Sequence, residues 1–503
     1  MTTSTSPDHS TAPDSPAEPD SPTSVEPPTA TASQVDVGSN RWYLSAAPVL
    51  RALVHLSVPM AAAFVVSALY NVINAGFIGS QHDTSLLAAV TFGTPILGLI
   101  MAVGSMFGVG GGALVSRLLG AAEHDAARAD DVKRASSFSL WGAVGAGVLL
   151  GALGLVFLQP LVGLLGAGGT GAAAATGEYV AVMLAFMPVL AAAFCLEQLV
   201  RAEGAARQAM VGLMLTTAAS LAFDVVFILL LHWGVGGVAL SMGLANLLAI
   251  AYWVRWLRRT GAAVSVSPKW FTLARTTVGP VLSIGVGALG QAAFMIVTSL
   301  VLNTLAAGYG EGPLAAMGVA VRIAQVPEFL IMGVTMGVLP LLAYAYGKGD
   351  RARLGSAVRT SFIAVGILAV LFSTIVFAFR DQVFGLFSDD SSLLAIGAVI
   401  ITAQLVAMIA NGFTGLLTSL FQACGKAVPS IVMSMAQGVL FIPVVIVANL
   451  WFGLPGIIWA LTVSEVAVLV AGLGMWLGYR RSIARGLSDG SPERAEQVLA
   501  ETA

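Results

Sequence analysis

Long apolar segments follow one another through most of the chain, separated by short stretches of Gly, Pro and charged residues. An α-helix rises about 1.5 Å per residue, so about 20 apolar residues cross the hydrocarbon core of a bilayer. The pattern predicts twelve such helices, at residues 53–79, 86–115, 138–158, 179–199, 211–231, 235–256, 278–305, 314–346, 360–379, 394–420, 431–450 and 453–477. Only a Gly-Leu-Pro-Gly sequence at 453–456 separates the last two, and we interpret it as a turn. We therefore expect an all-α polytopic membrane protein.

The composition narrows the class further. Hydrophobic residues make up 57% of the 503 positions and charged residues 10%, whereas soluble globular chains have about 45–50% and about 25%. This excludes a soluble enzyme, a fibrous protein and a disulfide scaffold, and the weak, scattered charge predicts no nucleic-acid partner. Cys195 and Cys424 match no metal-ligand spacing, so we expect them to be small buried apolar residues.

The ends of the chain differ from the apolar region. Residues 1–40 are rich in Pro, Ser, Thr and acidic residues and contain no Lys or Arg, so we predict a disordered tail without the features of a secretory signal. The predicted domains are an amino-terminal six-helix bundle at 41–256, a cytoplasmic linker at 257–277, a carboxy-terminal six-helix bundle at 278–481 and a cytoplasmic tail at 482–503.

The basic residues predict the orientation. With both termini in the cytoplasm, nearly all of the 24 Lys and Arg residues fall on the inner side. The exceptions are Arg380 in an outer loop and Arg322 inside a span. Because short cytoplasmic loops carry an excess of Lys and Arg, we expect a multi-pass protein of the plasma (inner) membrane with both termini cytoplasmic.

The two halves repeat one another. The Leu-Ser-Val-Pro sequence at 56–59 parallels Leu-Ser-Ile-Gly at 282–285, and Gly120 at the end of the second span matches Gly347 at the end of the eighth. Arg-Ala-Glu-Gly after the fourth span likewise parallels Gln-Ala-Cys-Gly after the tenth. Because six is an even number of spans, the two bundles have the same topology and are predicted to be parallel repeats.

Ionisable residues inside spans are costly and indicate function by default. Asp224 lies in the fifth span, one turn after Ser220, and such a carboxylate can carry a proton or bind a cation. Tyr70, Asn71 and Asn74 form a second polar face in the first span. The alternatives are a structural acid at position 224 and Asn side chains that only join helices.

The second half has its own candidates. Glu328 follows Pro327, which we expect to kink the eighth span beside a cavity, and Glu465 lies near the middle of the twelfth. Arg322 is the expected ion partner of either acid, so structural pairing competes with substrate binding here. Gln291 and Phe329, together with Tyr70 of the first span, are further candidates for the wall of the substrate cavity.

Other motifs are assigned to structure. Glu197 precedes Arg201 by four residues, the favourable order for an intrahelical ion pair, which we place close to the cytoplasmic surface. Three glycines at 110–112 indicate close helix packing or a hinge, since no Gly-Lys-Ser/Thr follows them. The sequence contains no HExxH, no GxSxG and no histidine cluster, so we do not expect an enzyme.

Several segments resemble one known family. They are Tyr-Asn-Val-Ile-Asn-Ala-Gly-Phe-Ile-Gly at 70–79, Gly-Gly-Ala-Leu-Val-Ser-Arg-Leu-Leu-Gly at 111–120, Arg-Ala-Glu-Gly at 201–204, Phe-Asp at 223–224 followed by Gly-Val-Gly-Gly at 234–237, and Pro-Leu-Leu-Ala-Tyr-Ala-Tyr-Gly at 340–347. In this order, they resemble the multidrug and toxic compound extrusion (MATE) family. The likeness extends from about residue 53 to residue 481.

The resemblance implies a V-shaped pair of bundles that exports bulky, usually cationic organic compounds by alternating access, in exchange for protons or sodium ions. The family has an aspartate where this chain has Asn74, often an asparagine where it has Ser220, and often a threonine where it has Met242. These departures weaken a sodium site, which requires several oxygen ligands. They favour protons and leave Asp224 as the coupling acid of the amino-terminal bundle.

We therefore expect a proton-coupled antiporter, less favourably a sodium-coupled one, with Asp224, Asn74, Asn71 and Ser220 at the coupling site. Its predicted partners are small organic molecules and the lipid bilayer, it needs no cofactor beyond the coupling ion, and it is expected to function as a monomer. The alternatives are a lipid-linked precursor flippase of the same superfamily and a non-transport integral-membrane protein.

Overall fold

Helices account for all the regular structure in the described part of the chain. The computed structural model describes residues 36–79, 84–307, 309, 311–379, 382 and 391–488. Within these residues, eleven helices are long and apolar enough to cross a membrane. A twelfth span is formed if α6 (Ala173–Ala185) and α7 (Met187–Ala202), which meet at a bend of 54°, are counted together. The predicted all-α fold class and the order of the spans are confirmed.

The other spans correspond one to one with the predicted segments. They are α2 (Val49–Gly79), α3 (Thr84–Ala121), α4 (Arg128–Val156), α8 (Ala206–Asp224) continued by the π-helical η1 (Val225–Leu230), α9 (Gly234–Thr260), α10 (Arg275–Ala307), α11 (Glu311–Lys348), α12 (Arg351–Ala378), α14 (Ser391–Ala423), α15 (Ala427–Phe452) and α16 (Leu454–Ser488). Most extend beyond the predicted bounds, because an apolar pattern marks only the part of a helix that crosses hydrocarbon.

Short elements were not predicted. The helices α1 (Asn40–Ser45) and α5 (Leu158–Leu164) and the 3-10 turn η2 (Pro268–Trp270) are too short for a periodic apolar pattern to indicate them. The helix α1 begins at the last residue of the predicted tail. Residues 1–35 and 489–503 of the two predicted tails lie outside the described residues.

The turn predicted at 453–456 consists of a single residue. The helix α15 ends at Phe452, Gly453 has a φ of 63°, and α16 begins at Leu454. Glycine tolerates this left-handed conformation because it has no Cβ. Pro455 falls in the first turn of α16, where its missing N–H costs no helical hydrogen bond.

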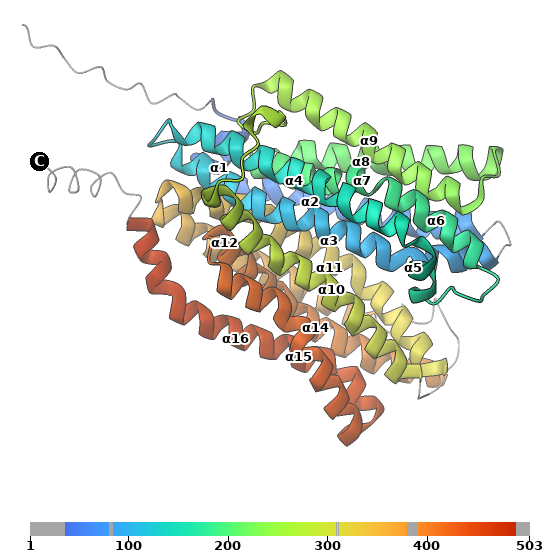
Figure 1. Cartoon of the computed structure of the whole chain (residues 1–503). Helices are drawn as coiled ribbons and strands as arrows, with labels where there is room; N and C mark the ends of the chain where they lie inside the picture. The colour runs from blue at the N-terminus through green and yellow to red at the C-terminus, as the bar shows by residue number, and fades with distance from the viewer. Residues whose placement is uncertain are drawn as a thin grey trace, which may run out of the picture. The chain divides into compact units, whose positions relative to one another are not determined.

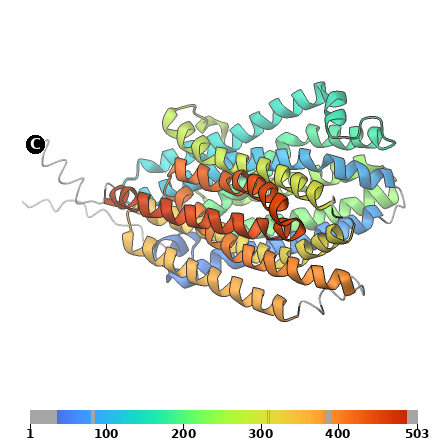
Figure 2. The same cartoon turned by 90° about the horizontal axis from the view of Figure 1, so that it is seen from below.

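The helices form two lobes of six spans. Figure 1 shows the blue-to-green helices α2–α9 above the yellow-to-red helices α10–α16, and Figure 2 shows them from below, with α16 towards the viewer. The connection between the lobes, residues 261–274, is shorter than predicted, because α9 continues to Thr260 and α10 begins at Arg275.

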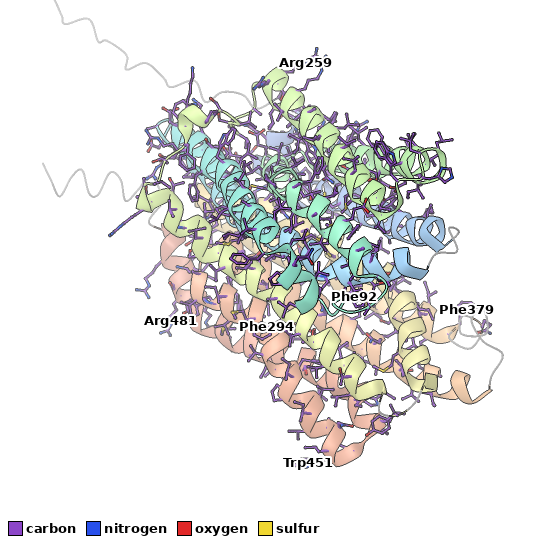
Figure 3. All side chains as sticks on the ribbon, turned by 45° about the vertical axis from the view of Figure 1, so that its right-hand side comes forward. Phe92, Arg259, Phe294, Phe379, Trp451 and Arg481 are labelled. Atoms are coloured by element: carbon purple, nitrogen blue, oxygen red, sulfur yellow. The ribbon has the colours of Figure 1, made fainter. Side chains whose placement is uncertain are left out.

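The two ends of the helices differ in their side chains. Figure 3 shows Arg259 and Arg481 towards one end and Phe379 and Trp451 towards the other. We call the first the basic end, and it carries Arg117, Arg259, Lys348, Arg353 and Arg481. Such segregation is what the positive-inside rule predicts for a membrane protein of this topology.

Glycines let the two lobes approach closely at the basic end. A Cβ at Gly120 of α3 would overlap the carbonyl oxygen of Tyr344 in α11, and a Cβ at Gly347 would overlap that of Arg117. Gly120 and Gly347 are the residues that the internal repeat matches with one another. The rotation that relates the lobes therefore brings equivalent glycines to the same interface.

Two further helix pairs, which the internal repeat relates to one another, also join the lobes at glycines. The helix α10 packs against α3, where Gly110 and Gly285 both leave no room for a Cβ against the opposite backbone. The helix α11 packs against α2, where Gly333 and Gly337 adjoin the backbone of Ala61 and Ser57. These glycines lie within about 22 Å of the basic ends at about 1.5 Å per residue, so all of these close backbone contacts are in that half of the helices.

Polar contacts join the lobes at the same end. Glu123, just after α3, forms an ion pair of 2.5 Å with Lys348 and accepts a hydrogen bond from the Tyr344 hydroxyl. A ring nitrogen of His124 lies 3.2 Å from the carbonyl oxygen of Lys348. The end of α3 is thus tied to the end of α11.

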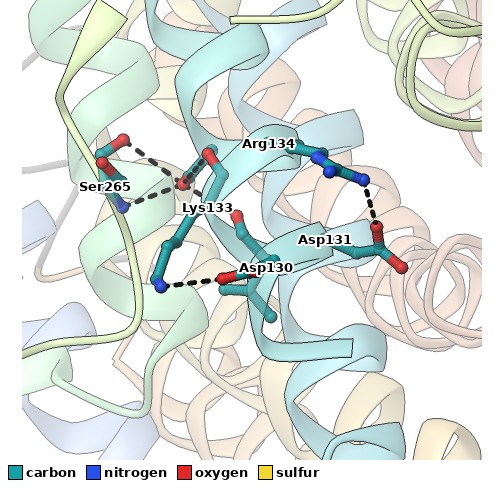
Figure 4. Close-up of polar contacts among 7 residues, drawn as sticks. Asp130, Asp131, Lys133, Arg134 and Ser265 are labelled. Carbon is teal, nitrogen blue, oxygen red and sulfur yellow. Dashed lines mark hydrogen bonds and ion pairs between the residues drawn. The ribbon is translucent and has the colours of Figure 1, made fainter. Parts of the chain in front are cut away.

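The connection between the lobes is anchored on α4. The Ser265 N–H donates to the Ser136 hydroxyl at 2.9 Å, as Figure 4 shows for Ser265 beside the start of α4. The exposed first turns of α4 carry ion pairs between Lys133 and Asp130, 2.8 Å apart, and between Arg134 and Asp131, 3.4 Å apart. The connection is therefore held against the amino-terminal lobe.

We predict that Gly347→Ala lowers the free energy of unfolding by about 1–3 kcal/mol, the usual cost of overpacking, because its methyl group would meet the backbone of Arg117. The matched control is Gly355→Ala in α12, where a Cβ meets nothing within 4 Å. We expect the control to be neutral or stabilising. Thermal unfolding followed by circular dichroism measures both, and equal stability of the two variants would contradict the close approach.

Candidate ion-coupling site

Asp224 is completely buried in the amino-terminal lobe. It is the last residue of α8, and its side chain has a relative exposure of 0%. The Tyr70 hydroxyl of α2 donates to Oδ2 at 3.1 Å, and the Ser241 hydroxyl of α9 donates to Oδ1. Three helices thus contribute to one carboxylate site, and both carboxylate oxygens accept a hydrogen bond.

The backbone changes at this point. The helix α8 gives way to the π-helical η1 immediately after Asp224. Wider turns of this kind are found mostly at functional sites, because the extra residue per turn reorients the side chains beside it. The local structure therefore singles out the same residue as the sequence.

The predicted coupling residues are located in part. Ser220 is 2% exposed and lies one turn before Asp224 on the same helix. Tyr70, which we expected in the substrate cavity, is bonded to Asp224. Asn71 and Asn74 belong to α2, but their side chains lie outside the described residues. Their contact with Asp224 stays a prediction.

Ser241 was not predicted. The family pattern often has a threonine at the neighbouring position, which is Met242 in this chain. In the structure, the Ser241 hydroxyl is the group that reaches Asp224. The available signal was a single hydroxyl in an apolar stretch of α9. One residue of difference on a helix is a rotation of about 100°, so the family pattern without a structure could not decide between them.

A second buried carboxylate lies in the carboxy-terminal lobe. Glu465 of α16 is 5% exposed, and the side-chain amide of Gln437 in α15 donates to its two oxygens at 2.9 and 3.1 Å. The Asn411 side-chain amide of α14 donates to Oε1 at 3.3 Å. The Gln291 side-chain amide of α10 donates to the side-chain oxygen of Gln437 at 3.4 Å. Amides from two helices therefore replace water around Glu465, and a third helix supplies Gln291 to one of them.

These amides are not the partner that we expected for Glu465. We expected Arg322, but its side chain lies outside the described residues. Gln437 and Asn411 were not predicted as partners. Their signal in the sequence was an isolated amide inside an apolar span, the same signal that we used for Asn71 and Asn74.

The cavity candidates Arg322, Glu328 and Phe329 lie on α11, and the side chains of the last two are described. Glu328 is exposed, and the Phe329 ring stacks on that of Phe64 in α2, with centroids 6.2 Å apart. This stacking places Phe329 between the lobes. The helix runs from Glu311 to Lys348 without interruption, including Pro327.

The predicted pair of Glu197 and Arg201 is confirmed, with a separation of 3.5 Å, and both side chains are buried within the protein. The Arg201 side chain is only 2% exposed. The Arg201 guanidinium also donates to the side-chain oxygen of Gln198 and, at 3.5 Å, to the Met336 sulfur of α11. The opposite lobe covers this end of α7, which the sequence of one helix could not indicate.

The fold and these clusters define a polytopic helical membrane protein of two repeat-related lobes, each with a buried carboxylate in the described residues. The MatE family model matches residues 59–228 and 288–447. The chain is 31% identical over 432 residues to the multidrug export protein MepA of Staphylococcus aureus (strain MRSA252), covering 86% of this chain and 94% of the relative. It is 30% identical to the MepA protein of Staphylococcus saprophyticus, with the same coverage.

Solved structures share the fold. A crystal structure of MATE in complex with MaL6 has a TM-score of 0.80 at 22% identity and covers 90% of this chain and 99% of its own. A structure described as the outward-facing conformation of a multidrug resistance MATE family transporter of the MOP superfamily has a TM-score of 0.80 at 21% identity, with the same coverage. The chain belongs to the multidrug and toxic compound extrusion (MATE) family.

We predict that Gln437→Leu lowers the free energy of unfolding by about 1–3 kcal/mol, because both Glu465 oxygens lose a donor in a buried site. The control is Gln291→Leu, which removes an exposed amide that bonds only to Gln437 at 3.4 Å among the described contacts. We expect its effect to stay below about 0.5 kcal/mol. Thermal unfolding by tryptophan fluorescence compares the two, and a larger loss for Gln291→Leu would refute the arrangement.

Proposed function

We propose that this protein is a secondary active antiporter that exports cationic or amphiphilic organic compounds in exchange for protons, by alternating access. The observation that carries the proposal is Asp224, a completely buried carboxylate with hydroxyl partners on two other helices of its lobe. The family membership of the chain supports export, since its curated relatives are multidrug export proteins.

The partners of Asp224 suit a group that gains and loses a proton. A hydroxyl has one donor hydrogen and two acceptor lone pairs, so Tyr70 and Ser241 can donate to the carboxylate and can rotate to accept from the carboxylic acid. Both protonation states therefore keep hydrogen bonds in a site away from water. Asn71, Asn74 and Ser220 belong to the same proposed coupling site.

Protons are favoured over sodium ions as the coupling species. A sodium site needs several hard oxygen ligands around the ion. This chain has Asn74 where the family has an aspartate, and Ser220 where it often has an asparagine. With one titratable acid in the proposed site, proton exchange needs only Asp224.

We place the substrate between the lobes. The stacked rings of Phe64 and Phe329 offer aromatic faces there, which attract organic cations. Glu328, next to Phe329, adds an exposed carboxylate that would complement a positive charge. Arg322, Glu465 and Gln291 remain further candidates in the same lobe, and one copy of the chain suffices for this arrangement.

We predict that Asp224→Asn reduces export driven by a pH gradient at least about tenfold, because the amide keeps a hydrogen-bonding group but cannot carry a proton. Everted membrane vesicles with a fluorescent organic cation such as ethidium provide the measurement. Asp131→Asn is the matched control, since Asp131 is an exposed carboxylate at the start of α4.

Binding and ion movement complete this test. The Asp224→Asn protein should still bind the cation in detergent. In sodium-free medium, the lumen of wild-type proteoliposomes should become more alkaline as the cation is taken up, because protons leave in exchange. Undiminished export by Asp224→Asn would exclude Asp224 as the coupling acid. Export that required sodium at a constant pH gradient would instead identify sodium as the coupling ion.

We propose that the basic end and both termini face the cytoplasm, in the plasma membrane. Lys269→Cys in the connection between the lobes is exposed at the basic end, and Thr170→Cys is exposed between α5 and α6 at the other end. We predict that an impermeant maleimide labels only Thr170→Cys in intact cells and labels Lys269→Cys after the membrane is opened. Labelling of Lys269→Cys from outside would reverse the orientation.

A further inference from the structure

The short helix α1 folds back onto the start of α2. The Ser39 hydroxyl accepts the Trp42 N–H at 3.2 Å and caps its first turn. The Tyr43 ring stacks on His55 with centroids 3.6 Å apart, and the Arg51 guanidinium lies 5.4 Å from the Trp42 ring centroid. These contacts give a six-residue helix, which is too short to be stable alone, a defined position.

On one side α1 packs against the amino-terminal lobe. Gly204, in the turn between α7 and α8, has a φ of 81°, and a Cβ there would lie 2.7 Å from the Asn40 carbonyl oxygen and 3.0 Å from the Leu44 side chain. Leu44 is completely buried. The glycine therefore has two reasons to be present, its backbone conformation and the closeness of α1.

On the other side α1 contacts the carboxy-terminal lobe at α11 and at one residue of α12. The Arg353 guanidinium of α12 donates to the carbonyl oxygens of Leu44 at 2.7 Å, Ala47 at 2.8 Å and Tyr43 at 2.9 Å. The Asp350 side chain accepts the Arg353 N–H at 2.8 Å, which fixes the first turn of α12. One side chain thus bonds three backbone groups of the opposite lobe.

The carbonyls of Tyr43 and Leu44, in the last turn of α1, need a partner, and that of Ala47 lies just beyond the helix. The last carbonyls of a helix have no partner within the helix and carry its partial negative charge. A guanidinium presents several N–H donors in one plane, and hydrogen bonds from a charged donor are stronger than neutral ones. Arg353 therefore supplies at one point what the end of α1 lacks.

The connection between the lobes is bonded in a comparable way. It precedes α10, as α1 precedes α2, and it is bonded to α4, the repeat equivalent of α12, through Ser136 and Ser137. The Val264 N–H donates to Glu203 at 2.7 Å. Burial raises the pKa of Glu203, whereas this N–H and the nearby charge of Arg41 in α1 act in the opposite direction.

Each lobe is therefore bonded to the segment that leads into the other lobe: α1 is bonded to the carboxy-terminal lobe, and the connection is bonded to the amino-terminal lobe. The connection is continuous with both lobes, so it cannot be released from either of them completely. The amino-terminal segment differs, because in the described residues its attachment to α12 consists of the Arg353 hydrogen bonds. Separation of the lobes at the basic end must break these bonds or remove α1 from Gly204.

We propose that residues 39–47 form a clamp between the lobes, which is engaged while the basic end is closed and is released when that end opens, and that Arg353 is the positioning residue that holds it. The proposal rests on the alternating access proposed above. It assigns the amino-terminal segment a part in setting the balance between the two access states.

The test measures the distance between the lobes directly. Spin labels are attached at Arg128→Cys of α4 and Arg481→Cys of α16, both exposed, while the native Cys195 and Cys424 are buried. Double electron-electron resonance then gives the distribution of distances across the basic end. We expect Arg353→Gln to raise the ratio of long to short distances about tenfold, because several charge-assisted hydrogen bonds are lost.

The matched control is Arg351→Gln, an exposed arginine two residues earlier, which should leave the distribution as in the wild type. Arg353→Lys keeps the charge on a single nitrogen that cannot reach three carbonyls together, so it should shift the ratio in the same direction but less. This variant also serves if Arg353→Gln does not fold.

Folded Arg353→Gln or Arg353→Lys protein with an unchanged distribution would overturn the clamp, even if its unfolding temperature fell. Measurement of ethidium export in the same variants separates this outcome from failure of the proposed function. Distances that shift in the variants while the wild-type chain exports nothing would support the clamp and refute the proposed function. Normal export with unchanged distances would do the reverse.

Discussion

At several glycines the helix backbones of the two lobes come into close contact. In a bilayer the lipid is as apolar as the helix surface, so association depends on close packing and not on exclusion of water. Gly120 and Gly347 lie at the basic end of the interface, where α3 meets α11, and Gly110 and Gly285 bring α3 and α10 together further along the helices. Any side chain at these positions would separate the lobes. The ion pair of Glu123 with Lys348 and the Arg353 bonds to α1 are possible because the glycines have already brought these groups together.

Asp224 and Glu465, the buried carboxylates of the candidate sites, are subject to a second constraint. A carboxylate away from water must receive hydrogen bonds from the protein. The described partners of Asp224 all lie in the amino-terminal lobe, and those of Glu465 all lie in the carboxy-terminal lobe. A movement of one lobe against the other as a rigid body therefore breaks neither set of bonds. The contacts that such a movement must break, including the Arg201 contact with Met336, join the lobes.

The acids of the site could be found from the sequence, but most of their partners could not. Asp224 and Glu465 stand out because a charge inside an apolar span is costly wherever its helix is placed. Partners depend on which faces of different helices meet. Ser241 was therefore overlooked beside Met242, and Gln437 and Asn411 were overlooked as the groups that bond Glu465. Glu197 and Arg201 lie four residues apart on one helix, so their pairing was predictable although their burial was not.

The sequence by itself determined the number and order of the spans, the internal repeat and the family. Each span satisfies its own backbone within one segment of chain, so its presence depends only on local residues. The tertiary structure alone decided that equivalent glycines face one another, that α11 covers Arg201, and that Arg353 reaches across to the end of α1. Those contacts join residues more than a hundred positions apart, and the rotation and depth of each helix against its neighbours is set by packing with all of them at once.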